Sequence, residues 1–264
     1  MNWYRTDIYD KAPETWDELL ATAEKSTDLA MGFAVGLSDG SNGTALMETF
    51  TPWLRSAGGD LFDKDGKAIF NSEAGVKVVN FIKQLVEAGT MDKSVLNMAY
   101  DDVVDAFKSG TVYAMDAGTQ RASAIKSSDL ASNFASAPIA GVNGAAPAFV
   151  AGQTLAIGSQ AKDPDMAWDF IRYFYTVENQ KKWMSAKCMT VRTDVFDEAE
   201  IQAMDDYEGV KMWSEYATTG SMTFFPADYT ELETRIAQAV QSVVFQGADA
   251  QTALDSVADW YNNK

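Results

Sequence analysis

The stretch 51–75 constrains the fold more than any other part of this sequence, because three structural signals follow one another in it. The pair Gly58-Gly59 closes an amphipathic segment, and glycine readily takes the positive φ that ends a helix and reverses the chain. Asp63-Lys-Asp-Gly66 then indicates a tight turn between two short apolar runs. Asn71 is a suitable N-cap for a following helix. The stretch predicts a helix, a glycine turn, a hairpin and a second helix, as in an α/β domain.

Hydrophobic periodicity and end signals predict the other elements. A capping box at Thr15 and Glu18 opens the first predicted helix, and Asp163-Pro164 opens a later one. The predicted helices cover 15–25, 71–89, 100–110, 163–175, 176 to beyond 183, 226–245 and the residues after Gly247. The predicted strands cover 32–36, 112–117, 148–157 and 189–192.

The charge and the histidine and cysteine counts exclude several classes of function. With 21 Lys and Arg against 38 Asp and Glu, the net charge of −17 opposes binding to nucleic acid or to an anionic membrane surface. The sequence has no histidine, which removes the Ser-His triad and the usual zinc ligand. Cys188 is the only cysteine, so no intramolecular disulfide can form. We expect neither a metal nor a cofactor.

Aromatic residues at the ends of predicted elements are candidate stacking platforms for sugar rings, whose hydroxyl groups bind carboxylate and amide side chains. Each one alone is more often part of a core. Paired carboxylates can also hydrolyse glycosides. The pairs at 101–102, 198–200 and 205–206, however, are more typical of a solvated surface. The aromatic candidates are Phe50, Trp53, Phe149, Phe224, Phe225 and Tyr229.

Seven segments, in order, resemble the extracellular solute-binding proteins of ABC transporters, in particular the carbohydrate-binding family that includes the maltose-binding protein. Among them are the "PETWDEL" segment, the "GGDLF" turn, the "FNSEAG" helix start and the "YAMDAG" strand. The resemblance covers essentially the whole chain. The matching segments are 2–19, 50–54 with 57–62, 70–75, 102–110, 113–118, 149–157 and 167–183.

The resemblance implies an α/β fold of the type II periplasmic-binding-protein kind, in which two lobes enclose a cleft. Residues 1–152 and 196–264 correspond to the second, C-terminal lobe, and 153–195 to a helical segment of the first lobe. Family members carry a signal peptide and roughly a hundred further residues of the first lobe before this point, so we expect a chain truncated at its N-terminus. We therefore expect an exposed apolar patch, masked by self-association or by relocation of the helices, along Leu155, Trp168, Ile171, Tyr175 and Trp183.

The function that the resemblance implies is sugar or oligosaccharide binding in the cleft and delivery to the permease subunits of an ABC importer, without catalysis. The full-length form would be extracellular, either periplasmic or a cell-surface lipoprotein, although no signal peptide stands at the start of this sequence. Ligand contacts are expected at strand ends and helix starts facing the cleft. The predicted contacts are Asp39, Asn42, Glu48, Phe50, Asp116, Gln120, Gln153, Tyr229 and Glu231.

Two alternatives remain open at this stage. One is an enzyme that acts on glycosides with paired carboxylates, which reversible binding without turnover would exclude. The other is a truncated lobe that no longer binds a ligand, because half of the cleft is missing.

Overall fold

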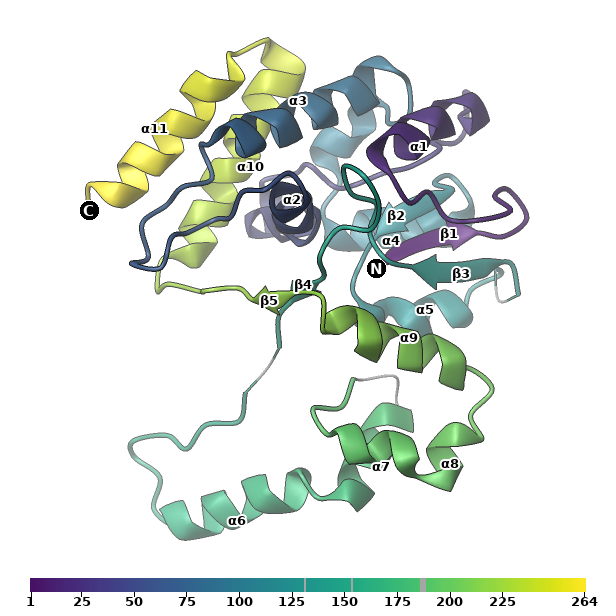
Figure 1. Ribbon diagram of the computed structural model, residues 1–264, viewed down its shortest axis with the longest axis vertical. Coiled ribbons are helices and arrows are strands. Elements are labelled where there is room, and N and C mark those ends of the chain that lie inside the picture. The colour runs from purple at the N-terminus through teal and green to yellow at the C-terminus, as the bar shows by residue number, and fades with distance from the viewer. Residues whose placement is uncertain (131, 153, 186–188) are drawn as a thin grey trace.

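The computed structural model describes residues 1–130, 132–152, 154–185 and 189–264. A three-stranded sheet in the order β2-β1-β3 lies within the larger part of the molecule, and both outer strands run antiparallel to β1 (Figure 1). The short strands β4 and β5 form a separate parallel pair at the edge of this part. The strands are β1 (Asn2–Arg5), β2 (Ala114–Asp116), β3 (Phe134–Ala137), β4 (Phe149–Val150) and β5 (Ser221–Met222).

Helices make up most of the rest of the described chain. The helices α1, α2, α3, α10 and α11 gather on one side of the sheet, and α9 runs along the other side (Figure 1). The α-helices are α1 (Trp16–Ala21), α2 (Thr44–Ser56), α3 (Glu73–Glu87), α4 (Tyr100–Ser109), α5 (Ala122–Lys126), α6 (Pro164–Phe174), α7 (Val177–Ser185), α8 (Ala199–Gln202), α9 (Tyr207–Ala217), α10 (Tyr229–Gln246) and α11 (Ala250–Asn262).

Aromatic rings from three helices pack together at the centre of the core. The ring of Trp16 stacks on that of Phe81 with centroids 4.1 Å apart, and Trp53 meets both rings edge-on. Burial of such large rings contributes most of the stabilisation in a core of this kind. This cluster holds α1, α2 and α3 together through Trp53 in the C-terminal half of α2.

The prediction for 51–75 is confirmed in its main features. Gly58 has φ of +88° just after α2, and the Asp63 amide donates to the Lys67 carbonyl at 2.9 Å across the turn. The capping prediction at Asn71 is wrong, because the N-cap of α3 is Ser72. Asn71 instead donates to Asp255 of α11 at 2.7 Å, a contact that no local pattern indicates.

Three strand predictions are corrected by the structure. Segment 32–36 is buried as expected but forms a single isolated parallel bridge among the described residues, between Ala34 and Met115. Among the described residues of 148–157, only Phe149–Val150 is a strand. Segment 189–192 is a loop, in which the Thr190 hydroxyl donates to Gln180 of α7. The central strand β1 and helix α9 were not predicted.

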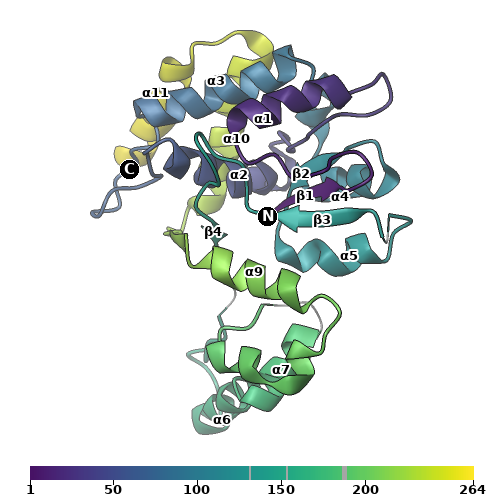
Figure 2. The ribbon, with the colours of Figure 1, turned by 45° about the vertical axis from the view of Figure 1, so that its right-hand side comes forward.

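The helices α6, α7 and α8 extend away from the sheet as a separate arm (Figures 1 and 2). In the patch expected on this arm, the side chains of Leu155, Trp168 and Trp183 are exposed, while Ile171 and Tyr175 are half-buried. The exposure predicted from sequence is therefore confirmed for three of the five residues. No helix in the described ranges has the length and apolar character needed to cross a membrane.

Candidate functional site

Polar groups from distant parts of the chain meet near the N-terminal half of α2, where Glu48 lies. Burial raises the pKa of the Glu48 carboxyl above its ordinary value. A hydrogen bond with Tyr100 and the positive charge of Arg121 oppose this rise. Glu48 is half-buried, so its carboxyl can accept further hydrogen bonds from a solute.

Tyr100, the first residue of α4, connects Glu48 to the turn after β2. Its hydroxyl accepts the Gly118 amide at 2.6 Å and the Gln120 side-chain amide at 3.3 Å. The Arg121 guanidinium lies over the Tyr100 ring, 4.5 Å from its centroid. Arg121 also pairs with Asp101 at 2.5 Å, so its position is fixed from two sides. The hydroxyl and the ring of Tyr100 together hold the turn 119–121 beside Glu48.

The first turns of α10 bring Tyr229 and Glu233 to the same place. Burial and then the negative charge of Glu48 raise the pKa of Glu233 to about 7. The Tyr229 hydroxyl is buried without a partner among the described residues, and its pKa is raised by burial and by the charge of Glu233. A buried donor without a partner costs about 1–3 kcal/mol, which a bound water or solute would recover.

Asp116 at the end of β2 contributes a third buried carboxyl. Burial raises its pKa to about 6, although the Asn2 side chain donates to it at 3.0 Å. The Thr49 hydroxyl also hydrogen-bonds with Asp116 and so opposes the rise of its pKa. The side-chain oxygen of Asn2 is buried without a hydrogen-bond partner among the described residues. The nitrogen of Met1 lies near the carboxyls of both Asp116 and Glu48, so these acids belong to one region.

Four of the predicted contacts lie in this one region of the structure: Glu48, Asp116, Gln120 and Tyr229. Asp39 and Glu231 are exposed, and each binds a side chain of α10. The Asp39 carboxylate accepts from Gln238 at 3.0 Å, and the Glu231 carboxylate accepts from Arg235 at 2.9 Å. Each of these two carboxylates keeps a face open to solvent.

The remaining three predictions have different outcomes. Phe50 is 0% exposed and packs in the core, so its ring cannot touch a solute in this conformation. The sequence predicts this ring at the end of an element, but it lies on the inner face of α2. Gln153 lies outside the described residues, and so does the side chain of Asn42.

Sequence reasoning missed Tyr100 and Glu233, which are central to the cluster. Glu233 lies with Tyr229 and Leu232 on the buried face of α10. A carboxyl at an otherwise apolar helical position is the sequence pattern that could have indicated it as a site residue. Tyr100 had no such signal, because its role depends on a hydrogen bond to the distant Gly118. An exposed ring, that of Phe225, also lies beside the cluster, with its centroid 4.7 Å from that of Tyr229.

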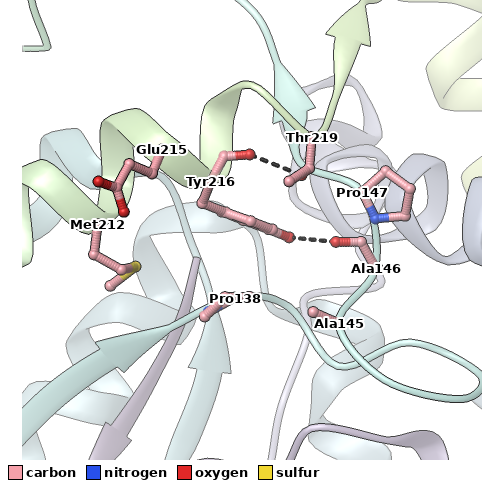
Figure 3. A pocket seen from close by; sticks show the side chains of 8 residues that line it. All are labelled: Pro138, Ala145, Ala146, Pro147, Met212, Glu215, Tyr216 and Thr219. Carbon is pink, nitrogen blue, oxygen red and sulfur yellow. Dashed lines mark hydrogen bonds between the residues drawn. The ribbon is translucent and has the colours of Figure 1, made fainter.

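A cavity of about 410 Å³ lies between α9 and the loop 138–147 (Figure 3). The Tyr216 hydroxyl donates to the Ala146 carbonyl at 2.9 Å and accepts the Ile139 amide at 3.1 Å. Both hydrogen bonds fasten α9 to the loop, and Glu215 is the only charged residue in the lining. None of the predicted contacts lines this cavity, so we place the candidate site at the carboxyl cluster.

Two kinds of known protein resemble this chain over nearly its full length. A probable ABC transporter-binding protein of Deinococcus radiodurans is 24% identical, and the match covers 97% of this chain but only 64% of the relative. Among solved structures, maltose-bound MalE3 of T. maritima has a TM-score of 0.83 at 22% identity, with 98% of this chain and 68% of that chain covered. A solute-binding protein from Thermotoga lettingae with bound α-D-tagatose has a TM-score of 0.83 at 21% identity. That match covers 100% of this chain and 69% of the Thermotoga chain.

These structures confirm the expected fold class, while the chain spans less than two thirds of the length of the Deinococcus relative. The family model for the bacterial extracellular solute-binding proteins matches residues 1–207. The chain belongs to the bacterial extracellular solute-binding protein family.

Proposed function

We propose that this chain is the substrate-binding subunit of an ABC importer and binds a sugar or oligosaccharide for delivery to the permease. The observation that carries the proposal is the cluster of Glu48, Asp116 and Glu233, which concentrates hydrogen-bond acceptors at one edge of the fold. Structurally similar solute-binding proteins are known with maltose and with α-D-tagatose bound. No catalytic step is needed for this role.

The chemistry of the cluster suits a neutral, hydroxyl-rich solute. Sugar hydroxyls donate to the carboxyls of Glu48 and Asp116, and they accept from the Gln120 amide. The exposed ring of Phe225 offers an apolar surface on which a pyranose face can pack. The Tyr229 hydroxyl, which lacks a partner among the described residues, gains one when the solute binds.

We further propose that residues 1–152 and 196–264 form the second lobe of the fold and that 153–195 belong to the first lobe. The separation of α6 and α7 from the sheet in Figure 2 supports this division. The cluster then forms the second-lobe wall of an interlobe cleft, and Asp39, Asn42, Gln153 and Glu231 are further contacts at its margin. Closure of two lobes on a solute would present the closed form to the permease.

Calorimetric titration with maltose, laminaribiose and tagatose tests the proposal. We expect saturable binding of at least one sugar, and Glu48→Gln should weaken it by about 10- to 100-fold, because a hydrogen bond to a charged group contributes about 1.5–3 kcal/mol. The matched control is Glu24→Gln, which makes the same change at an exposed residue outside the cluster and should leave the affinity unchanged.

Two results would contradict the proposal. Binding that Glu48→Gln and Asp116→Asn both leave intact would move the site elsewhere. No binding of any sugar, by a chain whose folding is verified by circular dichroism, would favour a lobe that does not bind ligand by itself. Release of a chromophore from nitrophenyl glycosides would instead support the enzyme alternative.

A further inference from the structure

Glu233 of α10 is a buried acid without a partner in the described part of the chain. Its side chain is only 8% exposed, yet it forms no hydrogen bond or ion pair with any residue that the structure describes. The Tyr229 hydroxyl, also buried without a partner, lies one helical turn away on the same face of α10. Buried polar groups are normally hydrogen-bonded, so this pair marks a place where a solute can supply the missing partners.

The charges around Glu233 favour its neutral form. The short 3₁₀ helix Gly40–Gly43 and the helices α2, α3 and α11 pack against α10. Among the described residues of these elements, Glu48 of α2 is the only charged group that shifts the pKa of Glu233. A solute that excludes water from the site would favour the neutral form further, because desolvation penalises a charge.

Two guanidinium groups lie on the same helices, and both already have partners. They are that of Arg55 on α2, which is bound to Asp60 and to the Ser221 carbonyl at 3.1 Å each, and that of Arg235 on α10, which is bound to Glu231 at 2.9 Å. Neither of them acts on the Glu233 carboxyl. An ionised Glu233 therefore has no counter-ion within the described ranges.

The balance of donors and acceptors in the cluster also favours a neutral Glu233. An ionised carboxylate can only accept hydrogen bonds, and Glu48 and Asp116 already offer acceptors to the hydroxyls of a sugar. A protonated carboxyl donates one hydrogen bond and can still accept others. It can therefore bind a sugar oxygen that carries no hydrogen, such as the ring oxygen, which a carboxylate would repel.

On the basis of the sugar-binding function proposed above, we propose that Glu233 binds the sugar as a neutral carboxylic acid and donates a hydrogen bond to a sugar oxygen. Binding is then linked to the uptake of a proton by Glu233, and the site releases the sugar as the pH rises. The Tyr229 hydroxyl completes the contact on the same face of α10. Glu233 is thus a specificity-determining residue of the site.

Calorimetric titration between pH 6.5 and 8.5 tests the proposal, with whichever of maltose, laminaribiose and tagatose binds most tightly. The affinity should fall about 20-fold over this range, because only the protonated fraction of a group with a pKa of about 7 is competent to bind. In buffers of different ionisation enthalpy, binding at pH 8 should take up about one proton per sugar. Circular dichroism at each pH verifies that the chain stays folded.

Two substitutions at Glu233 separate a donor from a structural side chain. Glu233→Gln keeps a neutral donor, so it should remove the pH dependence and the proton uptake and should bind about tenfold more tightly than the parent at pH 8.5. Glu233→Leu has a similar size but no donor, and it should bind weakly at both ends of the pH range.

Two further variants serve as controls. Asp116→Asn removes the other acid whose pKa is strongly raised, and it should bind more weakly but keep the fall in affinity above pH 7. Glu24→Gln changes an exposed acid outside the cluster and should follow the parent at every pH.

The outcomes distinguish this proposal from the proposed function. Sugar binding that does not weaken above pH 7, or a pH dependence that Glu233→Gln leaves unchanged, would overturn the role of Glu233 and leave the sugar-binding function standing. Equal affinities of the Gln and Leu variants would show that residue 233 does not donate to the sugar. A folded chain that binds no sugar at any pH would overturn both proposals.

Discussion

Glu48 on α2 lies close enough to Glu233 on α10 for its negative charge to act on it: burial first, and then the charge of Glu48, raise the pKa of Glu233 to about 7. Two acids that face each other in a buried region cannot both ionise without a cost in free energy. The structure thus keeps one proton in the candidate site close to neutral pH. This pair gives the first prediction.

The stability of the chain should fall as the pH rises from 5 to 8. The pKa of Glu233 rises from an ordinary 4.5 to about 7 on folding, so the folded chain holds a proton that the unfolded chain loses in this window. The resulting stabilisation is complete below pH 4.5 and is lost as the pH passes through 7. Urea unfolding should show a loss on the order of 1–3 kcal/mol between pH 5 and 8.

Glu233→Gln separates this effect from other titrations. It should flatten the pH dependence and make the chain more stable than the parent at pH 8. A residual slope is expected from Asp116, whose pKa rises from 3.8 to about 6 on folding. An unchanged slope in Glu233→Gln would show that Glu233 does not hold the proton.

Tyr100→Phe should lower the free energy of unfolding by about 1–3 kcal/mol. The substitution leaves the Gly118 amide without its partner, since that amide donates to the Tyr100 hydroxyl at 2.6 Å. Urea denaturation at pH 7 measures the loss. Tyr173→Phe is the control, because Tyr173 is exposed on α6 and loses no contact within the described structure. Equal stability of the two variants would contradict the role given to the Tyr100 hydroxyl.

Gly43→Ala should destabilise the chain more than Gly58→Ala does. Both glycines have positive φ, +73° and +88°, so each alanine carries a backbone strain of about 1 kcal/mol. A β-carbon at Gly43 would also lie 2.7 Å from the Glu233 carbonyl oxygen, whereas one at Gly58 meets nothing within 4 Å. The extra loss, about 1–3 kcal/mol by urea unfolding, measures how closely α10 approaches this turn. A smaller loss for Gly43→Ala than for Gly58→Ala would show that the two segments are farther apart.

Phe225→Ala should weaken sugar binding about tenfold, and Phe224→Ala should not. The two rings are adjacent in sequence and similarly exposed, but they pack in different places. Phe225 meets Tyr229 beside the carboxyl cluster, while Phe224 meets Phe62 of the hairpin, with centroids 5.5 Å apart. Loss of a stacking surface for a pyranose ring accounts for the difference. Calorimetry with the best-bound sugar decides it, and equal affinities would remove Phe225 from the site.

The elements that sequence alone determined depend on residues within about four positions of one another. The Thr15 hydroxyl accepts the Glu18 amide, the Asp163 carboxylate accepts the Met166 amide, and the turn at Asp63 closes as predicted. Such contacts form wherever the local sequence is right, because they need no distant partner. The order of these elements was also enough to indicate the family.

The tertiary structure decided which side chains meet and which are covered. The sequence predicts both Phe50 and Phe225 as stacking platforms, yet the assembled core buries the first ring and leaves the second exposed. Glu48 and Glu233 become a pair only when α2 packs against α10. Tyr100 hydrogen-bonds with Glu48 and, through the Gly118 amide, connects it to the turn after β2. The pKa of an acid and the exposure of a ring depend on everything packed around them, and that environment is assembled from segments far apart in the sequence.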